Sequence, residues 1–368
     1  MRPHLIAMIA TAAALAGGLA HPAQAAADEA PGTASCPASF SLTAVGDIGG
    51  TAEFALALSE SGWVVGTART GTTSRPQVPI RQRIGSASAL GLLDGATFAR
   101  AMGVNNRGTA VGEAFTASPE SSRAARWESN GRINLLPGLD GAAGVANAIN
   151  NRGDVVGSSS GRAVIWPATG KNRQTVRALP RHTERSGAVA RATDVDENGT
   201  VVGSSTVWIG HGDHDHATPR AMRWDVGAVT HLGGLTDDGS SVALAVSGHH
   251  VVGEASSEAA ASEAVYFSGG EAQALAALGR WTHSRANDVN ADGLAVGHES
   301  RFAGNTSFGG TAVMWCGGIA VALADLVSDL PAGWELRSAE AVNAAGQVVG
   351  YGSNGQETVS FLLSPVDQ

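Results

Sequence analysis

The sequence has little charge, little cysteine and almost no lysine. Only 15% of its 368 residues are charged, two are cysteines, and Lys171 is the single lysine. Low charge together with 43% hydrophobic residues excludes a disordered chain, and two cysteines exclude a small domain built on many disulfides. Acidic residues exceed basic ones by 33 to 24, so the net charge of -9 argues against a nucleic-acid partner.

Long apolar runs are also missing beyond the first 25 residues, which have the pattern of an export signal. Arg2 and His4 form a short positive start, 5–20 is apolar, and 23–25 fits a small-x-small cleavage site. The apolar run is shorter than the roughly 20 residues of a membrane span. We predict a cleaved signal peptide at 1–25 and a secreted, extracellular protein without a membrane span; the alternative is a membrane anchor.

The two cysteines are Cys36 and Cys316. In an oxidising extracellular compartment, a lone pair of cysteines is a candidate disulfide. The alternative is two free, partly buried thiols.

Glycine, in contrast, is abundant, and its positions reveal an internal repeat. The 49 glycines have no three-residue period, which excludes collagen. Each repeat reads as small, any, small and aliphatic residues, then a polar turn, then Val-Gly, as in 101–112 and 146–157. Alternating apolar residues around a turn such as 150–153 predict a tight β-hairpin. Seven copies, one of them degenerate, close at Gly66, Gly112, Gly157, Gly203, Gly253, Gly297 and Gly350.

A second phrase follows most of the hairpins and ends on a large aromatic residue, mostly Trp. It reads as a third strand, and a short segment such as 133–136 reads as a fourth. Four short strands in about 45 residues are typical of a propeller blade, although a β-solenoid is the structural alternative. We expect four of these aromatic residues to pack between blades, with exposed stacking on a sugar as the alternative: Trp127, Trp166, Trp224 and Trp315.

The two ends of the repeat region predict ring closure. The last copy stops after a third strand at 361–363, and 40–45 resembles an orphan fourth strand. We therefore predict an all-β, seven-bladed propeller of four-stranded antiparallel blades, the last closed by the N-terminal strand. The expected organisation is a flexible linker at 26–38 and a propeller domain at 39–368. A closed ring needs no partner to cover its edges, so we expect a monomer.

The paired phrases resemble the extracellular repeats called HAF repeats, whose units combine His-Ala-Phe-x-Trp, a Leu-Gly-Gly phrase and an Ile-Asn-x-x-Gly-x-Val-Val-Gly hairpin. The best match runs through 220–224, 231–235 and 251–253, and the resemblance covers 40–363. This chain departs from the family at the histidine that gives the repeat its name. The resemblance implies a secreted repeat scaffold and transfers no catalytic residue.

Three arginines stand directly before the first small residue of the repeat, in units two, four and six. Equivalent positions lie at equal radius in a propeller, so we expect the guanidinium groups of Arg100, Arg191 and Arg285 to face one mouth. There they are candidates to bind an anionic ligand through bidentate hydrogen bonds. The alternative is that they point to solvent or pair with local carboxylates such as Glu340.

The longest insertion between a second and a third strand, 204–219, is rich in histidine. Imidazoles and carboxylates are ligands for Zn²⁺, although a solvated polar loop is the alternative. Trp208 in this insertion is a candidate aromatic platform for a ligand, or else it packs against the blade. The candidate metal ligands are His211, Asp213, His214 and His216.

Two hairpin turns, 194–199 and 288–293, carry oxygen ligands at positions 1, 3 and 5 before a glycine, as calcium loops do. The carboxylate expected at position 9 is replaced by valine in both. Asx turns explain the same residues without calcium.

These observations favour a secreted, non-catalytic binding module for an anionic or carbohydrate ligand, such as a glycan or anionic polymer of a cell surface. We therefore expect no cofactor, and Zn²⁺ and Ca²⁺ are the alternatives. The first alternative is a metal-assisted secreted hydrolase or lyase on the propeller scaffold. The second is a purely structural surface protein without a ligand.

Overall fold

The computed structural model describes most of the repeat region. The described residues are 34–45, 52–69, 77–83, 86–94, 96, 98–115, 122–168, 175–183, 185–211, 214–257, 262–280, 282–303 and 306–366. The predicted signal peptide at 1–25, and residues 26–33 of the predicted linker, lie outside them. Within the described part of the chain, no helix is long and apolar enough to span a membrane.

In this part of the chain, antiparallel strands that follow one another pair in units of four. Unit 1 consists of β2 (Ala52–Leu58), β3 (Trp63–Arg69), β4 (Gln77–Arg83) and β5 (Ser86–Ala89). Unit 2 consists of β6 (Phe98–Val104), β7 (Ala110–Phe115), β8 (Ser122–Trp127) and β9 (Ile133–Leu135). Unit 3 consists of β10 (Gly144–Ile149), β11 (Val155–Ser159), β12 (Arg162–Trp166) and β13 (Arg177–Ala178).

The pattern continues through the second half of the repeat region. Unit 4 consists of β14 (Ala190–Val195), β15 (Val201–His211), β16 (His214–Asp225) and β17 (Ala228–His231). Unit 5 consists of β18 (Ser241–Ser247), β19 (His250–Ser256), β20 (Ser262–Ser268) and β21 (Glu271–Ala274). Unit 6 consists of β22 (His283–Val289), β23 (Ala295–Ala303), β24 (Thr306–Cys316) and β25 (Ile319–Ala322). The described part of the chain also contains two short 3-10 helices, η2 (Leu139–Gly141) and η3 (Leu323–Leu326).

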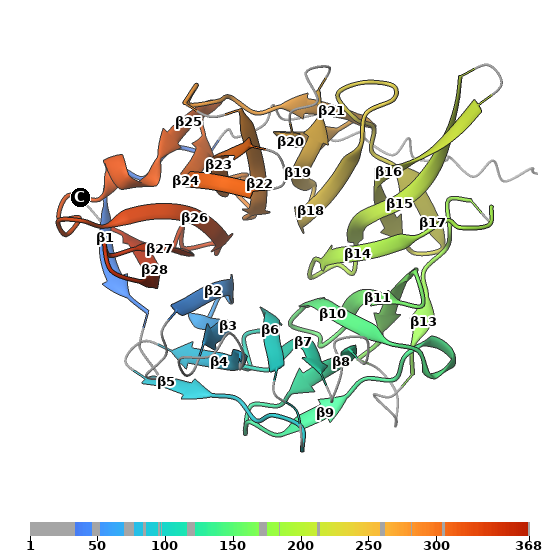
Figure 1. Ribbon diagram of the computed structural model, residues 1–368, viewed down its shortest axis with the longest axis horizontal. Helices are drawn as coiled ribbons and strands as arrows, with labels where there is room; N and C mark the ends of the chain where they lie inside the picture. Colours follow the sequence, from blue (N-terminus) through green and yellow to red (C-terminus); the bar gives the residue numbers. More distant parts are fainter. Residues whose placement is uncertain are drawn as a thin grey trace, which may run out of the picture.

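Unit 7 combines the two ends of the described chain. The strands β26 (Glu335–Val342), β27 (Val348–Ser353) and β28 (Thr358–Pro365) take β1 (Phe40–Ala44) as their fourth strand, antiparallel to β28. The units stand around a central opening, with the first strand of each unit innermost (Figure 1). This confirms the predicted class, an all-β propeller of four-stranded units whose last unit is closed by the N-terminal strand.

A disulfide joins Cys36 to Cys316 across a sequence separation of 280 residues. Cys36 lies just before β1, and Cys316 is the last residue of β24 in unit 6. The bond therefore ties the closing strand of unit 7 to its neighbouring unit.

The glycine that ends the Val-Gly phrase is required by a β-bulge. In every unit the pairing between the first and second strands shifts by one residue, for example between Ala146 and Ala148. At this bulge the first strand approaches the second so closely that a Cβ on Gly157 would overlap the carbonyl oxygen of Val145. The same holds at the other closing glycines, so only glycine fits there.

The aromatic residue of the third strand packs between units, as predicted. Trp127, Trp166, Trp224 and Trp315 are all buried, and each indole Nε1 donates to a backbone carbonyl in the connection that precedes its own unit. For Trp166 the acceptor is Pro137 O, at 2.7 Å. A buried indole with a bonded N–H fixes both the packing and the orientation of neighbouring units.

The insertion 204–219 is not the loop we expected. β15 and β16 continue through it as a hairpin, with Thr206 opposite Pro219 and His211 opposite His214. Alternating and β-branched residues in this stretch let the ladder of unit 4 extend beyond the ring.

Candidate functional site

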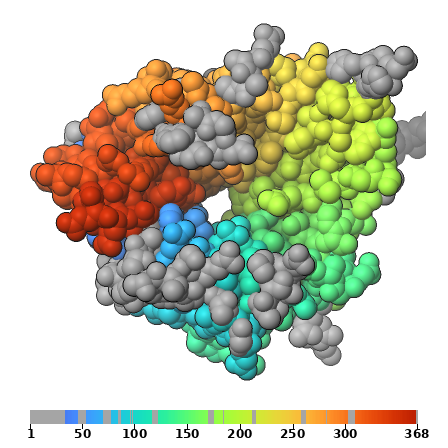
Figure 2. Space-filling model, in the orientation of Figure 1, coloured from blue at the N-terminus to red at the C-terminus, as the bar shows by residue number. Residues whose placement is uncertain are grey.

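A cavity of about 680 Å³ runs through the centre of the ring. It is lined by the first strand of every unit and by the hairpin turns of units 1 to 6, and Figure 2 shows the hollow between the units. Ligand pockets of proteins commonly have about 300–1,000 Å³, so this cavity is the main candidate site in the described part of the chain.

The bulged residue of each first strand lines this cavity. In units 1, 2 and 5 it is apolar: Leu56, Met102 and Leu244. In units 3, 4, 6 and 7 it is polar: Asn147, Thr193, Asn287 and Glu340. Three of the polar residues donate to the first strand of the next unit, with distances of 2.6 to 2.9 Å to Ala192 O, Ala243 O and Ala339 O. The cavity wall is therefore polar at two pairs of neighbouring units, 3 with 4 and 6 with 7, and apolar at units 1, 2 and 5.

The structure separates the three predicted arginines. Arg191 and Arg285 line the cavity. Arg100 does not; its Nε donates to Glu113 Oε1 at 2.8 Å, and its guanidinium lies 5.4 Å from the Phe98 ring centroid. Arg100 thus follows the alternative that we named, pairing with a local carboxylate, whereas Arg191 and Arg285 line the cavity.

The register of the hairpins explains this difference. Glu113 stands directly opposite Arg100, whereas Ser204 stands opposite Arg191 and His298 opposite Arg285. Arg285 Nη1 lies 3.4 Å from Glu254 Oε1 of the preceding unit. Arg191 is exposed, and within the described chain no residue forms an ion pair with it.

Around Arg285, units 5, 6 and 7 bring together a set of titratable and polar groups. Ser338 Oγ lies 3.1 Å from His298 Nδ1 and donates to Glu340 Oε1 at 2.5 Å. Tyr351 stands opposite Ser338 in the pairing of β26 with β27, and its ring packs edge-on against Phe54, with 5.1 Å between centroids. We call this set the polar arc: Glu254, Arg285, His298, Ser338, Glu340 and Tyr351.

Burial shifts the titration of the polar arc toward neutral forms. Burial, with a smaller effect of the Arg285 charge, lowers the pKa of His298 to about 4. Burial raises the pKa of Glu340 and, together with the Glu340 charge, that of Tyr351. At neutral pH, His298 is therefore an uncharged imidazole and Tyr351 an intact phenol, an arrangement in which one group accepts a proton and the other donates one.

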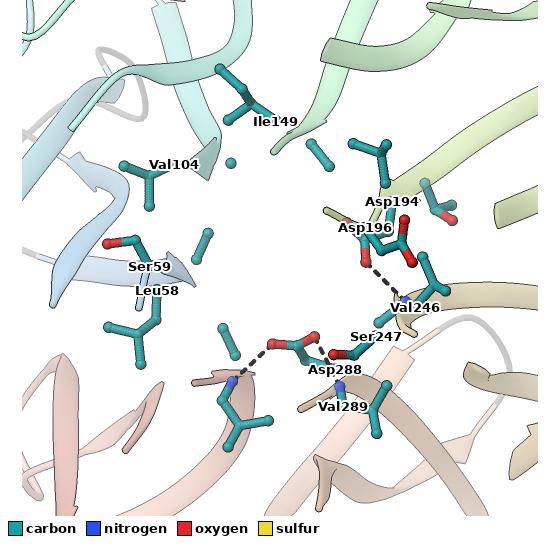
Figure 3. Close-up of a pocket in the computed structure, with 18 of the residues that line it drawn as sticks. Leu58, Ser59, Val104, Ile149, Asp194, Asp196, Val246, Ser247, Asp288 and Val289 are labelled. Carbon is teal, nitrogen blue, oxygen red and sulfur yellow. Dashed lines mark hydrogen bonds between the residues drawn. The ribbon is translucent and has the colours of Figure 1, made fainter. Parts of the chain in front are cut away.

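Two further carboxyl groups line the cavity nearer the hairpin turns (Figure 3). Asp194 accepts a hydrogen bond from Val246 N at 2.9 Å, and Asp288 accepts one from Val342 N at 2.8 Å, each in the next unit. Burial raises the pKa of Asp194 to about 6. Burial, with the nearby Asp194 charge, raises that of Asp288 to about 8.

These bonds bear on the candidate calcium loops. Asp196 Oδ1 accepts from Asn198 N and Thr200 N, which is an Asx turn, while Asp194 bonds to the neighbouring unit. In the second turn Asn290 closes its own turn in the same way. The oxygens of the first and third positions are thus bound to backbone N–H groups rather than directed at one point.

The candidate zinc ligands lie at the end of the β15–β16 hairpin. The backbones of His211 and His214 pair with each other, and His216 is an exposed residue of β16. Asp213 lies outside the described residues. Among those that are described, no group of three His, Cys, Asp or Glu side chains is placed to hold a metal ion.

Trp208 lies on the same hairpin and is half-buried. The guanidinium of Arg185 lies 4.9 Å from its ring centroid and donates to Asp215 Oδ2 at 2.6 Å. One face of the Trp208 ring is therefore already in contact with a protein cation.

Sequence reasoning missed most of the polar arc. The residue after Val-Gly is small in units 1, 3 and 4, but it is Glu113, Glu254, His298 or Tyr351 in units 2, 5, 6 and 7. This position stands opposite the residue that precedes the first small residue of the repeat, as His298 stands opposite Arg285 and Tyr351 opposite Ser338. It therefore lies at the same mouth of the ring as Arg285. Comparing that single position between copies would have revealed the arc.

Comparison with known proteins supports the fold alone. No family model and no curated protein matches this chain. Among solved structures, the β-propeller domain of the Trilobed protease from Pyrococcus furiosus is 9% identical, with a TM-score of 0.51; the match covers 90% of this chain and 97% of that one. YCF48, solved with a D1 peptide bound, is 13% identical, with a TM-score of 0.49 and 91% and 98% coverage. At this level of identity, the chain is similar to β-propellers in architecture.

Proposed function

We propose that this chain is a secreted binding module that holds an acidic carbohydrate at the Arg191 and Arg285 end of its central cavity. The export pattern of 1–25 supports the extracellular location, and the propeller supplies a rigid ring around one cavity. A carboxylate on a sugar is matched by a guanidinium, and the sugar hydroxyls by polar side chains such as Asn287 and Thr193. Both of these side chains line the cavity.

The observation that carries this proposal is the state of Arg191. Of three arginines at the same repeat position, Arg100 is bound by Glu113 and Arg285 lies beside Glu254, whereas Arg191 lines the cavity without an ion pair to any described residue. An exposed guanidinium at the rim of a polar cavity is available to an anionic ligand from solution.

Arg100 provides a matched control for the test. Binding of galacturonate, glucuronate and mannuronate oligosaccharides would be measured by calorimetry, alongside neutral oligosaccharides of equal length. We expect Arg191→Gln to weaken uronate binding about 10- to 100-fold, since a charge-assisted hydrogen bond contributes about 1.5–3 kcal/mol. Arg100→Gln should leave it unchanged.

Binding should also weaken as salt rises, because the contact is between charges. Equal affinity for uronate and neutral oligosaccharides, or equal losses in the two arginine variants, would contradict the proposal.

A further inference from the structure

The polar arc contains groups that simple ligand binding does not require. Arg285 and His298 face each other across the first hairpin of unit 6, and Ser338 and Tyr351 face each other at the same positions of unit 7. At the equivalent pairs of units 3 and 4, the residues are Val145 with Ser158 and Arg191 with Ser204. A basic group, an acidic group and a cation are thus concentrated in two neighbouring units.

Hydrogen bonds assign the proton on His298. Ser338 has one hydroxyl proton, which it donates to Glu340 Oε1, and its oxygen lies 3.1 Å from His298 Nδ1. Asn287 Nδ2, which donates to Ala339 O, lies 3.5 Å from the same nitrogen. On the shorter contact we assign the proton to Nδ1, with Ser338 as its acceptor. The Nε2 atom of His298 then carries the free lone pair. A neighbouring residue that fixes the tautomer of a histidine in this way is typical of a general base.

Tyr351 is placed as the complementary acid. It stands opposite Ser338 in the pairing of β26 with β27, and burial, together with the Glu340 charge, raises the pKa of its phenol. Arg285, which faces His298 across its hairpin, and Glu340 line the cavity. A substrate carboxylate bound by Arg285 would therefore lie next to both a base and an acid.

We propose that the polar arc catalyses β-elimination in uronate-containing polysaccharides. Arg285 binds and neutralises the uronate carboxylate, which acidifies the C–H bond on the adjacent carbon. His298 Nε2 takes that proton, and the electron pair of the broken C–H bond forms a carbon–carbon double bond. The glycosidic C–O bond on the next carbon breaks, and its oxygen leaves with the proton of Tyr351. His298 then returns its proton to Tyr351, so the cycle needs no water, oxidant or cofactor.

The carboxylates of the arc favour elimination over hydrolysis. Glycoside hydrolysis uses two carboxyl groups on either side of the bond, one of which must be free to act as a base or nucleophile. Here Glu254 is bound by Arg285 and by Ser262 Oγ at 2.9 Å, and Glu340 is bound by Ser338. The uncharged His298 is the better-placed base.

This inference rests on the proposed uronate binding, and one experiment distinguishes the two. The full-length chain, expressed with export, would be incubated with polygalacturonate, alginate and glucuronan, and the ultraviolet absorbance of the new conjugated double bond recorded. Mass spectrometry checks that one product end has lost the elements of water relative to hydrolysis. Neutral dextran serves as the control substrate.

Three variants test the assigned roles. Tyr351→Phe keeps the ring that packs on Phe54, and His298→Gln keeps a polar side chain of similar reach. We expect each to lower the elimination rate by about 100-fold or more, while uronate binding stays within about 3-fold. Tyr266→Phe, at the other tyrosine of the chain, should retain the wild-type rate.

Uronate binding without any unsaturated product would overturn the elimination and leave the binding function standing. Failure to bind uronates at all would overturn both. Normal rates in Tyr351→Phe and His298→Gln, with thermal denaturation confirming that both are folded, would show that the polar arc is not the catalytic site.

Discussion

The side-chain amide of Asn150 donates to the backbone carbonyl of Asp196 in the next unit at 3.0 Å, while its Oδ1 accepts from Gly153 N and Asp154 N in its own turn. One residue of the repeat thus closes a hairpin and links two units. Asn105 makes the same bond to Asn150 O at 3.3 Å, and Asn290 makes it to Asn343 O at 3.1 Å. The turn asparagine is therefore part of the ring as well as of the hairpin.

Asn150→Asp separates these two roles, because aspartate keeps the turn-closing oxygen and loses the donor. We expect it to lower the free energy of unfolding by about 1–3 kcal/mol, since a buried carbonyl loses its partner beside a new negative charge. Denaturant unfolding measures the change. Asn130→Asp, in an exposed turn, should stay within about 0.5 kcal/mol; equal effects at both sites would contradict the role of Asn150 between units.

A substitution at Gly157 tests whether the β-bulge requires glycine. A Cβ there would overlap Val145 O, so Gly157→Ala should destabilise the fold by about 1–3 kcal/mol as the strands separate. At Gly91 the nearest atom to an added Cβ is 3.4 Å away, an ordinary contact, so Gly91→Ala is the control. A Gly157→Ala protein as stable as the Gly91→Ala protein would show that the bulge adapts.

The Cys36–Cys316 disulfide should contribute about 2–4 kcal/mol, because it closes a very long loop of the unfolded chain. We expect reducing agent to lower the denaturation midpoint of the wild-type protein. The double variant Cys36→Ser with Cys316→Ala should start from the lower midpoint and not respond to reductant. A wild-type midpoint that is the same in both conditions would argue against a stabilising bond.

The raised pKa of Asp288 predicts that the stability of the folded protein depends on pH. Its pKa rises from 3.8 to about 8 in the folded protein, so between these values the folded chain holds a proton that the unfolded chain releases. The stabilisation from this group is full below about pH 4 and is lost as pH rises through about 8. Thermal unfolding of the wild type should therefore move to lower temperature over this window.

Asp288→Ala introduces the residue found at this position in most other units and should flatten that dependence. Asp292→Ala, in the exposed turn of the same unit, should leave the wild-type slope unchanged. An identical pH slope in Asp288→Ala and the wild type would refute the assignment and point to another group, such as Asp194.

The sequence alone predicted the parts of the fold that are local or repeated. The hairpins follow from apolar alternation around turns such as 150–153, and the buried role of Trp166 follows from its recurrence at the end of a third strand. Closure by 40–45 could be predicted because the last copy lacked a strand. Each of these features depends on residues within one copy, or on a count of strands.

Contacts between neighbouring units could not be predicted from the sequence, and these contacts determine the candidate site. Arg100 forms an ion pair and Arg191 does not, because Glu113 stands opposite the first and Ser204 opposite the second. That register is set by a bulge that the pattern of residues did not reveal. The polar arc joins His298 to Ser338 and Arg285 to Glu254, residues about 30 to 40 positions apart in neighbouring copies. The sequence by itself determined the repeating unit, because strands and turns are specified by near neighbours. Only the closed ring decided which side chains meet, because it places first strands from every unit around one cavity.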